Sequence, residues 1–178
     1  VMPSSYMEIS NFYTTTIYEK GAEVVRMYQT LLGQETFRMA TDAYFDRFDG
    51  KAATTDDFRE TMAEIGGRDL VQFRRWYEQA GTPLLEISEV FEDNKLILQI
   101  EQSCKPTPGQ EQKLPFHVPI VLGLLDESGQ ELDLSKTELH CSMDTSLRDE
   151  NRSLLLELRE DATEIEFASF DRKPVVSF

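Results

Sequence analysis

Apolar residues recur at helical spacing through the first part of the chain. Between residues 19 and 32 they lie three or four positions apart, and Gly33 follows as a helix-ending glycine. The same spacing predicts a second helix from residue 34 to the turn at Asp49-Gly50. The apolar stripes of these two helices consist of Val24, Met27, Tyr28, Leu31, Phe37, Ala40, Tyr44 and Phe48.

Two further helices are expected before residue 83. The first begins after Thr54 or Thr55, either of which can cap it, and the acidic pair Asp56-Asp57 fits its first turn. It ends at Gly66-Gly67. A fourth helix is predicted over 69–79, where Gly81-Thr82-Pro83 stops it. The buried positions in this part are Phe58, Met62, Ile65, Leu70, Phe73 and Tyr77.

After Pro83 the apolar period changes from about 3.6 to 2, which is the period of β-strands. Alternating runs predict strands at 95–101, 116–124, 154–158 and 165–167. The segments 105–114 and 142–152 are polar and are expected to be loops. The predicted core consists of Leu96, Leu98, Ile100, Val118, Ile120, Leu122, Leu156, Leu158, Ile165 and Phe167.

These patterns divide the chain into an all-helical segment, 1–82, and an all-β domain, 83–178. Short strands joined by polar turns favour a small antiparallel sandwich over a parallel sheet. The overall class is therefore α+β in two segments. The helical segment resembles the end of a larger domain, and the apolar run 174–178 stops abruptly, so we expect the sandwich to be cut at its last strand.

Charge excludes some classes of function. With 18 Lys+Arg against 33 Asp+Glu, the formal net charge of −15 would repel phosphate backbones, so a nucleic acid is not an expected partner. No apolar stretch approaches eighteen residues, and residues 1–10 lack the features of a signal peptide, so we expect no membrane partner. Cys104 and Cys141 fit neither a disulfide scaffold nor a CxxC site, which favours a reducing, cytoplasmic setting.

Few side chains in this sequence could carry chemistry on their own. His117 and His140 have no partners at a recognised metal spacing, so both are expected to be surface or hydrogen-bonded histidines, and no metal site is predicted. His140-Cys141 resembles a nucleophile beside its base, but adjacent strand residues point to opposite faces. The rings near Tyr13 and Tyr18 are explained by aromatic packing where a helix begins.

Three groups of residues, in a fixed order, resemble a known family. They are Asn11-Phe12-Tyr13 with Tyr18-Glu19-Lys20-Gly21-Ala22-Glu23-Val24, then Asp42 to Gly50 with Asp56-Asp57-Phe58, and finally Phe73-Arg74-Arg75-Trp76-Tyr77 with Gln79 and Gly81-Thr82-Pro83. Together they resemble an internal piece of the zinc aminopeptidase N family, of the bacterial alanyl aminopeptidase type. The resemblance implies the helical C-terminal part of a thermolysin-like catalytic domain, followed by a small β-sandwich.

The resemblance also implies roles for two tyrosines. Tyr18 matches the tyrosine whose hydroxyl, in this family, stabilises the tetrahedral intermediate of peptide hydrolysis. A tyrosine has an ordinary pKa of about 10, so at neutral pH it is a neutral hydrogen-bond donor suited to a developing oxyanion. Tyr13 matches a ring that lines the pocket near the N-terminal residue of the peptide substrate.

The family's remaining motifs are absent from this sequence. The resemblance places the His-Glu-x-x-His helix, the further glutamate that completes the zinc site and the Gly-x-Met-Glu-Asn loop upstream of Val1, and it places a large helical domain after the sandwich. We therefore expect zinc to be the cofactor of the parent protein, with its ligands outside this chain. The chain alone should be inactive, because three ligands and an open position are what allow zinc to activate water.

Two other classes of function remain open at this stage. The chain could be an interaction module whose sandwich binds a protein or carbohydrate, in which case an exposed apolar or aromatic patch is expected on the sandwich. It could also be an independent hydrolase that uses Asp and Glu pairs, but no accompanying acid or base signature supports that interpretation.

Overall fold

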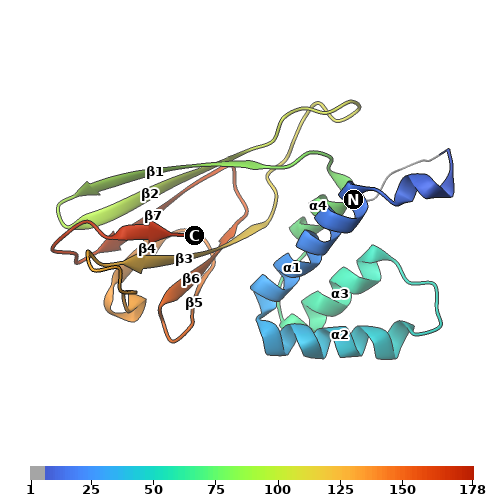
Figure 1. Cartoon of the computed structure of the whole chain (residues 1–178), viewed down its shortest axis with the longest axis horizontal. Coiled ribbons are helices and arrows are strands. Elements are labelled where there is room, and N and C mark those ends of the chain that lie inside the picture. The colour runs from blue at the N-terminus through green and yellow to red at the C-terminus, as the bar shows by residue number, and fades with distance from the viewer. Residues whose placement is uncertain (1–6) are drawn as a thin grey trace. The chain divides into compact units, whose positions relative to one another are not determined.

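The computed structural model describes residues 7–178, so the expectation of no signal peptide in 1–10 falls mostly outside the described residues. Two compact units follow one another, the first ending at Ala80 and the second beginning at Gly81. The first is helical and the second consists of strands (Figure 1). None of the helices among the described residues has the length and apolar character needed to cross a lipid bilayer.

The helical unit contains three long helices and several short turns. The two predicted helices after residue 33 begin and end close to their expected positions, and the first long helix is preceded by a short helical segment of different pitch. The elements are η1 (Ile9–Phe12), η2 (Thr16–Lys20), α1 (Gly21–Leu32), α2 (Gln34–Phe48), α3 (Thr55–Gly66), η3 (Gln72–Arg74) and α4 (Arg75–Glu78).

The start of α3 has the capping arrangement that the sequence predicts. The Thr54 hydroxyl accepts a hydrogen bond from the Asp57 backbone N–H at 3.2 Å, and the Asp57 carboxylate accepts one from the Thr54 N–H at 2.7 Å. This reciprocal capping box satisfies two backbone donors that a helix start leaves unpaired. At the other end Gly67 has φ of 60°, a left-handed conformation that glycine adopts without strain.

The fourth helix is shorter than predicted. Only η3 and the single turn of α4 are helical within the expected range 69–79. The Asp69 carboxylate accepts a hydrogen bond from the Val71 N–H at 2.9 Å, which holds the chain in a side-chain turn where the helix was expected to begin. Local side-chain bonding therefore competes successfully with the apolar period in this segment.

The second unit is an antiparallel β-sandwich, so the predicted α+β fold class is confirmed. One sheet has the strand order β1-β2-β7-β4 and the other β5-β6-β3-β8. Every strand pair in both sheets is antiparallel. The strands are β1 (Leu84–Glu92), β2 (Lys95–Ser103), β3 (Val118–Leu125), β4 (Glu138–Cys141), β5 (Thr145–Arg148), β6 (Ser153–Leu158), β7 (Ala162–Ala168) and β8 (Val175–Ser177), with the 3-10 turn η4 (Leu134–Lys136) between β3 and β4.

Three strands were not predicted, and one of them lies in a segment that was predicted to be a loop. β5 lies within 142–152, which was expected to be a loop, and neither β1 nor β4 was identified. β1 is an edge strand with mostly exposed residues, so it lacks the alternation that marks a half-buried strand. It pairs with β2 through the turn Asp93-Asn94, whose positive φ values of 48° and 62° suit a tight hairpin.

The predicted sandwich core is confirmed by burial. Each of the ten predicted residues either belongs to the buried cluster or packs against it, with only Val118 and Ile120 partly buried. The cluster also contains residues that the prediction missed. The buried set is Leu96, Leu98, Ile100, Leu122, Leu124, Leu134, Leu154, Leu156, Leu158, Ile165 and Phe167.

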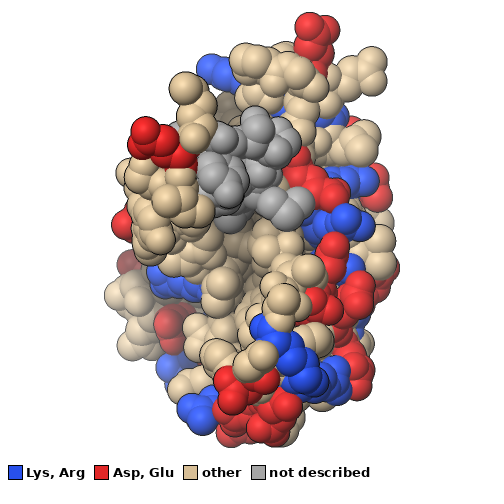
Figure 2. Space-filling model, turned by 90° about the vertical axis from the view of Figure 1, so that its right-hand side faces the viewer, with Lys and Arg blue, Asp and Glu red and all other residues tan. Residues whose placement is uncertain are grey.

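Charged side chains of both signs share the surface. On the face shown in Figure 2, red and blue groups are interspersed and do not form a patch of a single sign. Exposed ion pairs such as Arg47 with Glu64, at 2.7 Å, link neighbouring helices. The acidic excess is therefore distributed, as a solvated surface would be, and marks no acidic site on this face.

Shortening one core leucine should destabilise the sandwich far more than shortening an exposed one. Leu98 is fully buried, so Leu98→Ala should lower the free energy of unfolding by about 2–5 kcal/mol, because apolar contacts are lost and a cavity remains. Leu147 is 42% exposed, and Leu147→Ala should cost about 1 kcal/mol or less. Urea unfolding followed by circular dichroism measures both. Equal losses would contradict the assigned core.

Candidate functional site

Tyr18 lies in the segment η2, which is a π-helix that runs directly into α1. Its backbone N–H donates to the Thr14 carbonyl at 3.0 Å, and its own carbonyl accepts from the Gly21 N–H. A π-helical turn is less favourable than an α-helical one, and such turns occur frequently at functional sites. Tyr18 therefore lies on a π-helical turn directly before an α-helix.

The ring of Tyr18 faces away from the core of the helical unit. It is 57% exposed, and the ring of Tyr13, at 67% exposed, stacks beside it with centroids 6.2 Å apart and planes inclined by 23°. Within residues 7–178 the Tyr18 hydroxyl makes no hydrogen bond. The structure thus brings the two sequence-predicted site residues together and leaves this hydroxyl accessible to a ligand.

A buried aromatic cluster holds the helix behind Tyr18. The ring of Tyr28 on α1 is fully buried, with its centroid 4.3 Å from that of Phe73 and 5.5 Å from that of Phe58. The Tyr77 hydroxyl donates a hydrogen bond to the Tyr28 hydroxyl at 3.2 Å. Burial raises the pKa of both tyrosines above the ordinary value, so both hydroxyls keep their protons at neutral pH.

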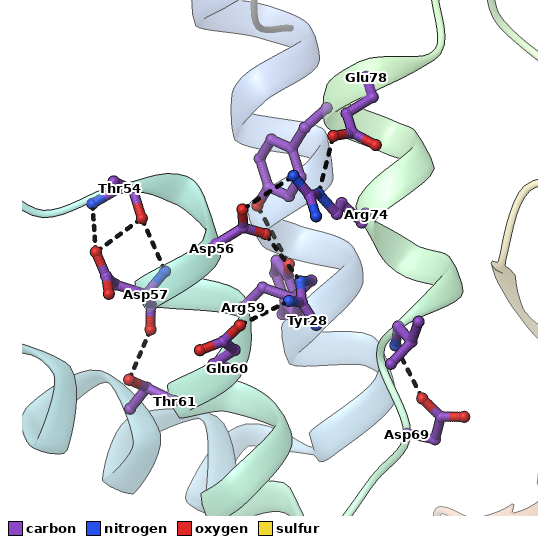
Figure 3. Close-up of polar contacts among 12 residues, drawn as sticks. Tyr28, Thr54, Asp56, Asp57, Arg59, Glu60, Thr61, Asp69, Arg74 and Glu78 are labelled. Atoms are coloured by element: carbon purple, nitrogen blue, oxygen red, sulfur yellow. Dashed lines mark hydrogen bonds and ion pairs between the residues drawn. The ribbon is translucent and has the colours of Figure 1, made fainter.

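Charged side chains lie close to Tyr28 of this cluster, as Figure 3 shows. Arg59 is 8% exposed, and its guanidinium lies 3.3 Å from the Asp56 carboxylate and 3.0 Å from that of Glu60. Arg74 binds the same Asp56 at 3.3 Å and also Glu78 at 2.9 Å. Asp56 therefore links α3 to η3 and α4. A mostly buried arginine requires such partners, because an unpaired buried charge is strongly destabilising.

The two histidines have different surroundings. His117 is fully buried, with Nε2 2.9 Å from a Glu157 carboxylate oxygen that also accepts from Arg159 Nη2 at 3.1 Å. His140 is exposed on β4, and its Nε2 lies 3.2 Å from Glu138. The expectation that each would be a surface or hydrogen-bonded histidine is therefore confirmed, although the complete burial of His117 was not foreseen.

Residues 7–178 do not fit a zinc ion. Among them no three side chains of His, Cys, Asp or Glu gather closely enough to hold a metal. The pair His117 and Glu157 is buried in the sandwich and offers two groups, where a zinc site needs three or four. Cys141 lies beside His140 on β4, but its thiol donates to the Met143 carbonyl at 3.6 Å. No step of chemistry at a metal is derived from these residues.

Sequence reasoning missed the partners that fix the candidate site. Tyr28 and Tyr77 were assigned to apolar stripes, but their hydroxyl pair was not predicted. A signal was available, since a tyrosine on a buried stripe needs a hydrogen-bond partner for its hydroxyl, and two such tyrosines in one small unit can supply each other. The burial of Arg59 had no comparable signal in the sequence.

Comparison with known proteins gives the family. Residues 1–77 match the Peptidase family M1 domain, and residues 81–178 match a domain of unknown function, DUF3458, with an Ig-like fold. Aminopeptidase N of Escherichia coli (strain K12) is 44% identical over 138 residues, which cover 76% of this chain. The chain belongs to the aminopeptidase N family.

Further relatives agree with this membership. Aminopeptidase N of Caulobacter vibrioides is 53% identical over 92 residues, which are 52% of this chain and 11% of the relative. A crystal structure of Legionella pneumophila aminopeptidase A in complex with aspartic acid matches 98% of this chain and 18% of that chain, with a TM-score of 0.75 and 28% identity. The chain spans only 16% of the length of the Escherichia coli member of the family.

The buried tyrosines predict that the helical unit loses stability at high pH. Below the ordinary tyrosine pKa of 10.0 both the folded and unfolded states keep the Tyr28 proton, and the stabilisation is fully present. Above it the unfolded state loses the proton first, so stability should fall by up to about 1.4 kcal/mol per pH unit for this group. Urea midpoints between about pH 9 and 11 measure the slope. Tyr28→Phe should reduce it, and an unchanged slope would contradict the assignment.

Proposed function

We propose that this chain supplies the hydroxyl donor Tyr18 to a zinc-dependent aminopeptidase that removes N-terminal residues from peptides. The observation that carries the proposal is the accessible Tyr18 hydroxyl on a π-helical turn, within the segment that matches the Peptidase family M1 domain. The names of the relatives, aminopeptidase N and aminopeptidase A, support the same reaction class.

The chemistry assigned to Tyr18 is hydrogen-bond donation to developing charge. When a peptide carbonyl is attacked, its oxygen becomes an oxyanion, and a fixed donor at hydrogen-bond distance lowers the energy of that state more than that of the substrate. The hydroxyl of Tyr18 keeps its proton through this step and stabilises the intermediate by position and polarity. The stacked ring of Tyr13 would line the pocket for the substrate's N-terminal side chain.

The two units have separate places in this proposal. Residues 1–82 form the helical end of the metallopeptidase domain, and 83–178 form the sandwich. Because residues 7–178 hold no metal-binding group of three side chains, the ligands of the zinc ion would come from other parts of the parent. Zinc supplies the activation of water in such enzymes. Neither Cys104 nor Cys141 forms a disulfide within residues 7–178, which fits a reducing, cytoplasmic setting.

Removing the Tyr18 hydroxyl in the full-length parent should slow the reaction without unfolding the protein. Tyr18→Phe should lower kcat by about 10²–10³, the usual effect of losing one oxyanion donor, while zinc content and Tm stay unchanged. Steady-state hydrolysis of an alanyl or leucyl amide measures kcat and KM. Tyr44→Phe is the matched control, since its ring packs among Phe45, Phe48 and Phe58 within the helical unit.

Two results would count against the role of Tyr18. Full activity of Tyr18→Phe would remove this residue from the mechanism. An equal loss in Tyr44→Phe would mean that any tyrosine change in this unit disturbs the enzyme. If the parent hydrolyses no aminoacyl amide but its sandwich captures a protein or carbohydrate, the interaction module would be the better assignment.

A protein of residues 1–178 alone should neither bind zinc tightly nor hydrolyse aminoacyl amides. The described residues offer no set of three ligands, and a hydroxyl donor without an attacked carbonyl has no oxyanion to stabilise. Metal analysis after dialysis, combined with a chromogenic leucyl amide at high protein concentration, tests this. Stoichiometric zinc with turnover that a chelator abolishes would require the proposal to be withdrawn.

A further inference from the structure

Two consecutive aromatic residues of α4 contact the helix that carries Tyr18. The Lys20 ammonium lies 6.0 Å from the centroid of the Trp76 ring, and the Tyr77 hydroxyl donates to that of Tyr28. Both α4 residues are nearly buried, Trp76 at 6% and Tyr77 at 8% exposed. An ammonium over a partly desolvated indole ring is attracted by the ring's negative face. The continuous helix of η2 and α1 therefore contacts α4 at two positions along its length, at Lys20 and at Tyr28.

These contacts lie on the face of the helix opposite to Tyr18. Lys20, Val24 and Tyr28 follow one another at intervals of four residues, so their side chains share one face, and Val24 and Tyr28 are buried there. Tyr18 precedes Lys20 by two residues, which is about half a helical turn, so its side chain points toward the other side. The contacts on the buried face therefore determine the direction in which the exposed Tyr18 ring points and its position along the helix axis.

The π-helical turn makes this anchoring necessary. Its wider winding leaves the five residues of η2 with weaker internal support than α-helix gives, so their position depends on contacts outside the helix. The Lys20 ammonium over Trp76 is such a contact, within two residues of Tyr18. About two helical turns further along α1, Tyr28 is fixed by its ring contacts with Phe73 and Phe58 and by Tyr77.

We propose that Trp76 and Tyr77 are positioning residues, which set the location of the Tyr18 hydroxyl through Lys20 and Tyr28. This inference rests on the proposed role of Tyr18. A donor displaced by about 1 Å loses much of its effect on a transition state, and losses of up to 10² are known from such shifts. Because the donor acts on the transition state, the loss should fall on kcat and leave KM nearly unchanged.

A double-mutant cycle in the full-length, zinc-loaded parent tests the proposal. Tyr77→Phe, which removes one oxygen, and Lys20→Met, which removes the charge, should each lower kcat by about tenfold with KM within about twofold. In a Tyr18→Phe background neither change should lower kcat further, because the donor they position is already gone. Lys20→Arg keeps a cation over Trp76, so its kcat should be close to that of wild type and above that of Lys20→Met. Tyr44→Phe should leave kcat unchanged.

The possible outcomes separate the two proposals. If Tyr18→Phe is fully active, the role of Tyr18 fails, and the positioning role fails with it. If Tyr18→Phe is slow but Tyr77→Phe and Lys20→Met retain full kcat, only the positioning role is wrong. The positioning role is also wrong if Tyr77→Phe and Lys20→Met lower kcat by the same factor in the presence and in the absence of the Tyr18 hydroxyl. Their effect would then not depend on the position of that hydroxyl. A Tm within about 2 °C of wild type excludes loss of folding as the cause.

Discussion

The helical unit depends on the burial of one tyrosine ring. Tyr28 packs against Phe58 of α3 and Phe73 of η3 and accepts a hydrogen bond from Tyr77 of α4, so a single side chain of α1 contacts the three segments α3, η3 and α4. An aromatic ring contributes a large buried area, while its hydroxyl demands a partner in a defined direction. Packing therefore holds these segments together, and the hydroxyl pair fixes their mutual position.

The sandwich uses a comparable combination of apolar burial and one directed polar contact. Alternation along β2 places its leucines and isoleucine in the core, whereas Gln102, 6% exposed, binds both backbone groups of Phe116 through its amide. These two bonds replace strand pairing at the point where the chain returns from the 105–114 loop. Leaving a buried backbone N–H or C=O without its partner costs about 1–3 kcal/mol, so these two bonds to Phe116 are important for stability.

Elements with a periodic pattern of apolar residues were predicted from the sequence. Elements that depend on short-range hydrogen bonds or on pairing with a neighbouring strand were not. The capped helix α3 and the alternating strand β2 were recognised because cap and period coincide with burial. The fourth helix does not begin at residue 69, because the Asp69 side chain forms a turn there. The edge strand β1 has little apolar alternation and exists because β2 offers it hydrogen bonds.

The candidate site was also predicted only in part. The resemblance to a family identified Tyr18 and Tyr13. The π-helical turn was not predicted, and the hydroxyl pair behind it was missed because it joins two tyrosines that are distant in sequence. A physical consequence follows from the 57% exposure of Tyr18. Water competes for an exposed donor and weakens its interaction with an oxyanion, whereas exclusion of water strengthens that interaction several-fold. In the proposed role, the hydroxyl would act as a strong donor only when other protein surface and the substrate cover it. This chain would then supply the orientation of the donor, and its surroundings would supply the desolvation.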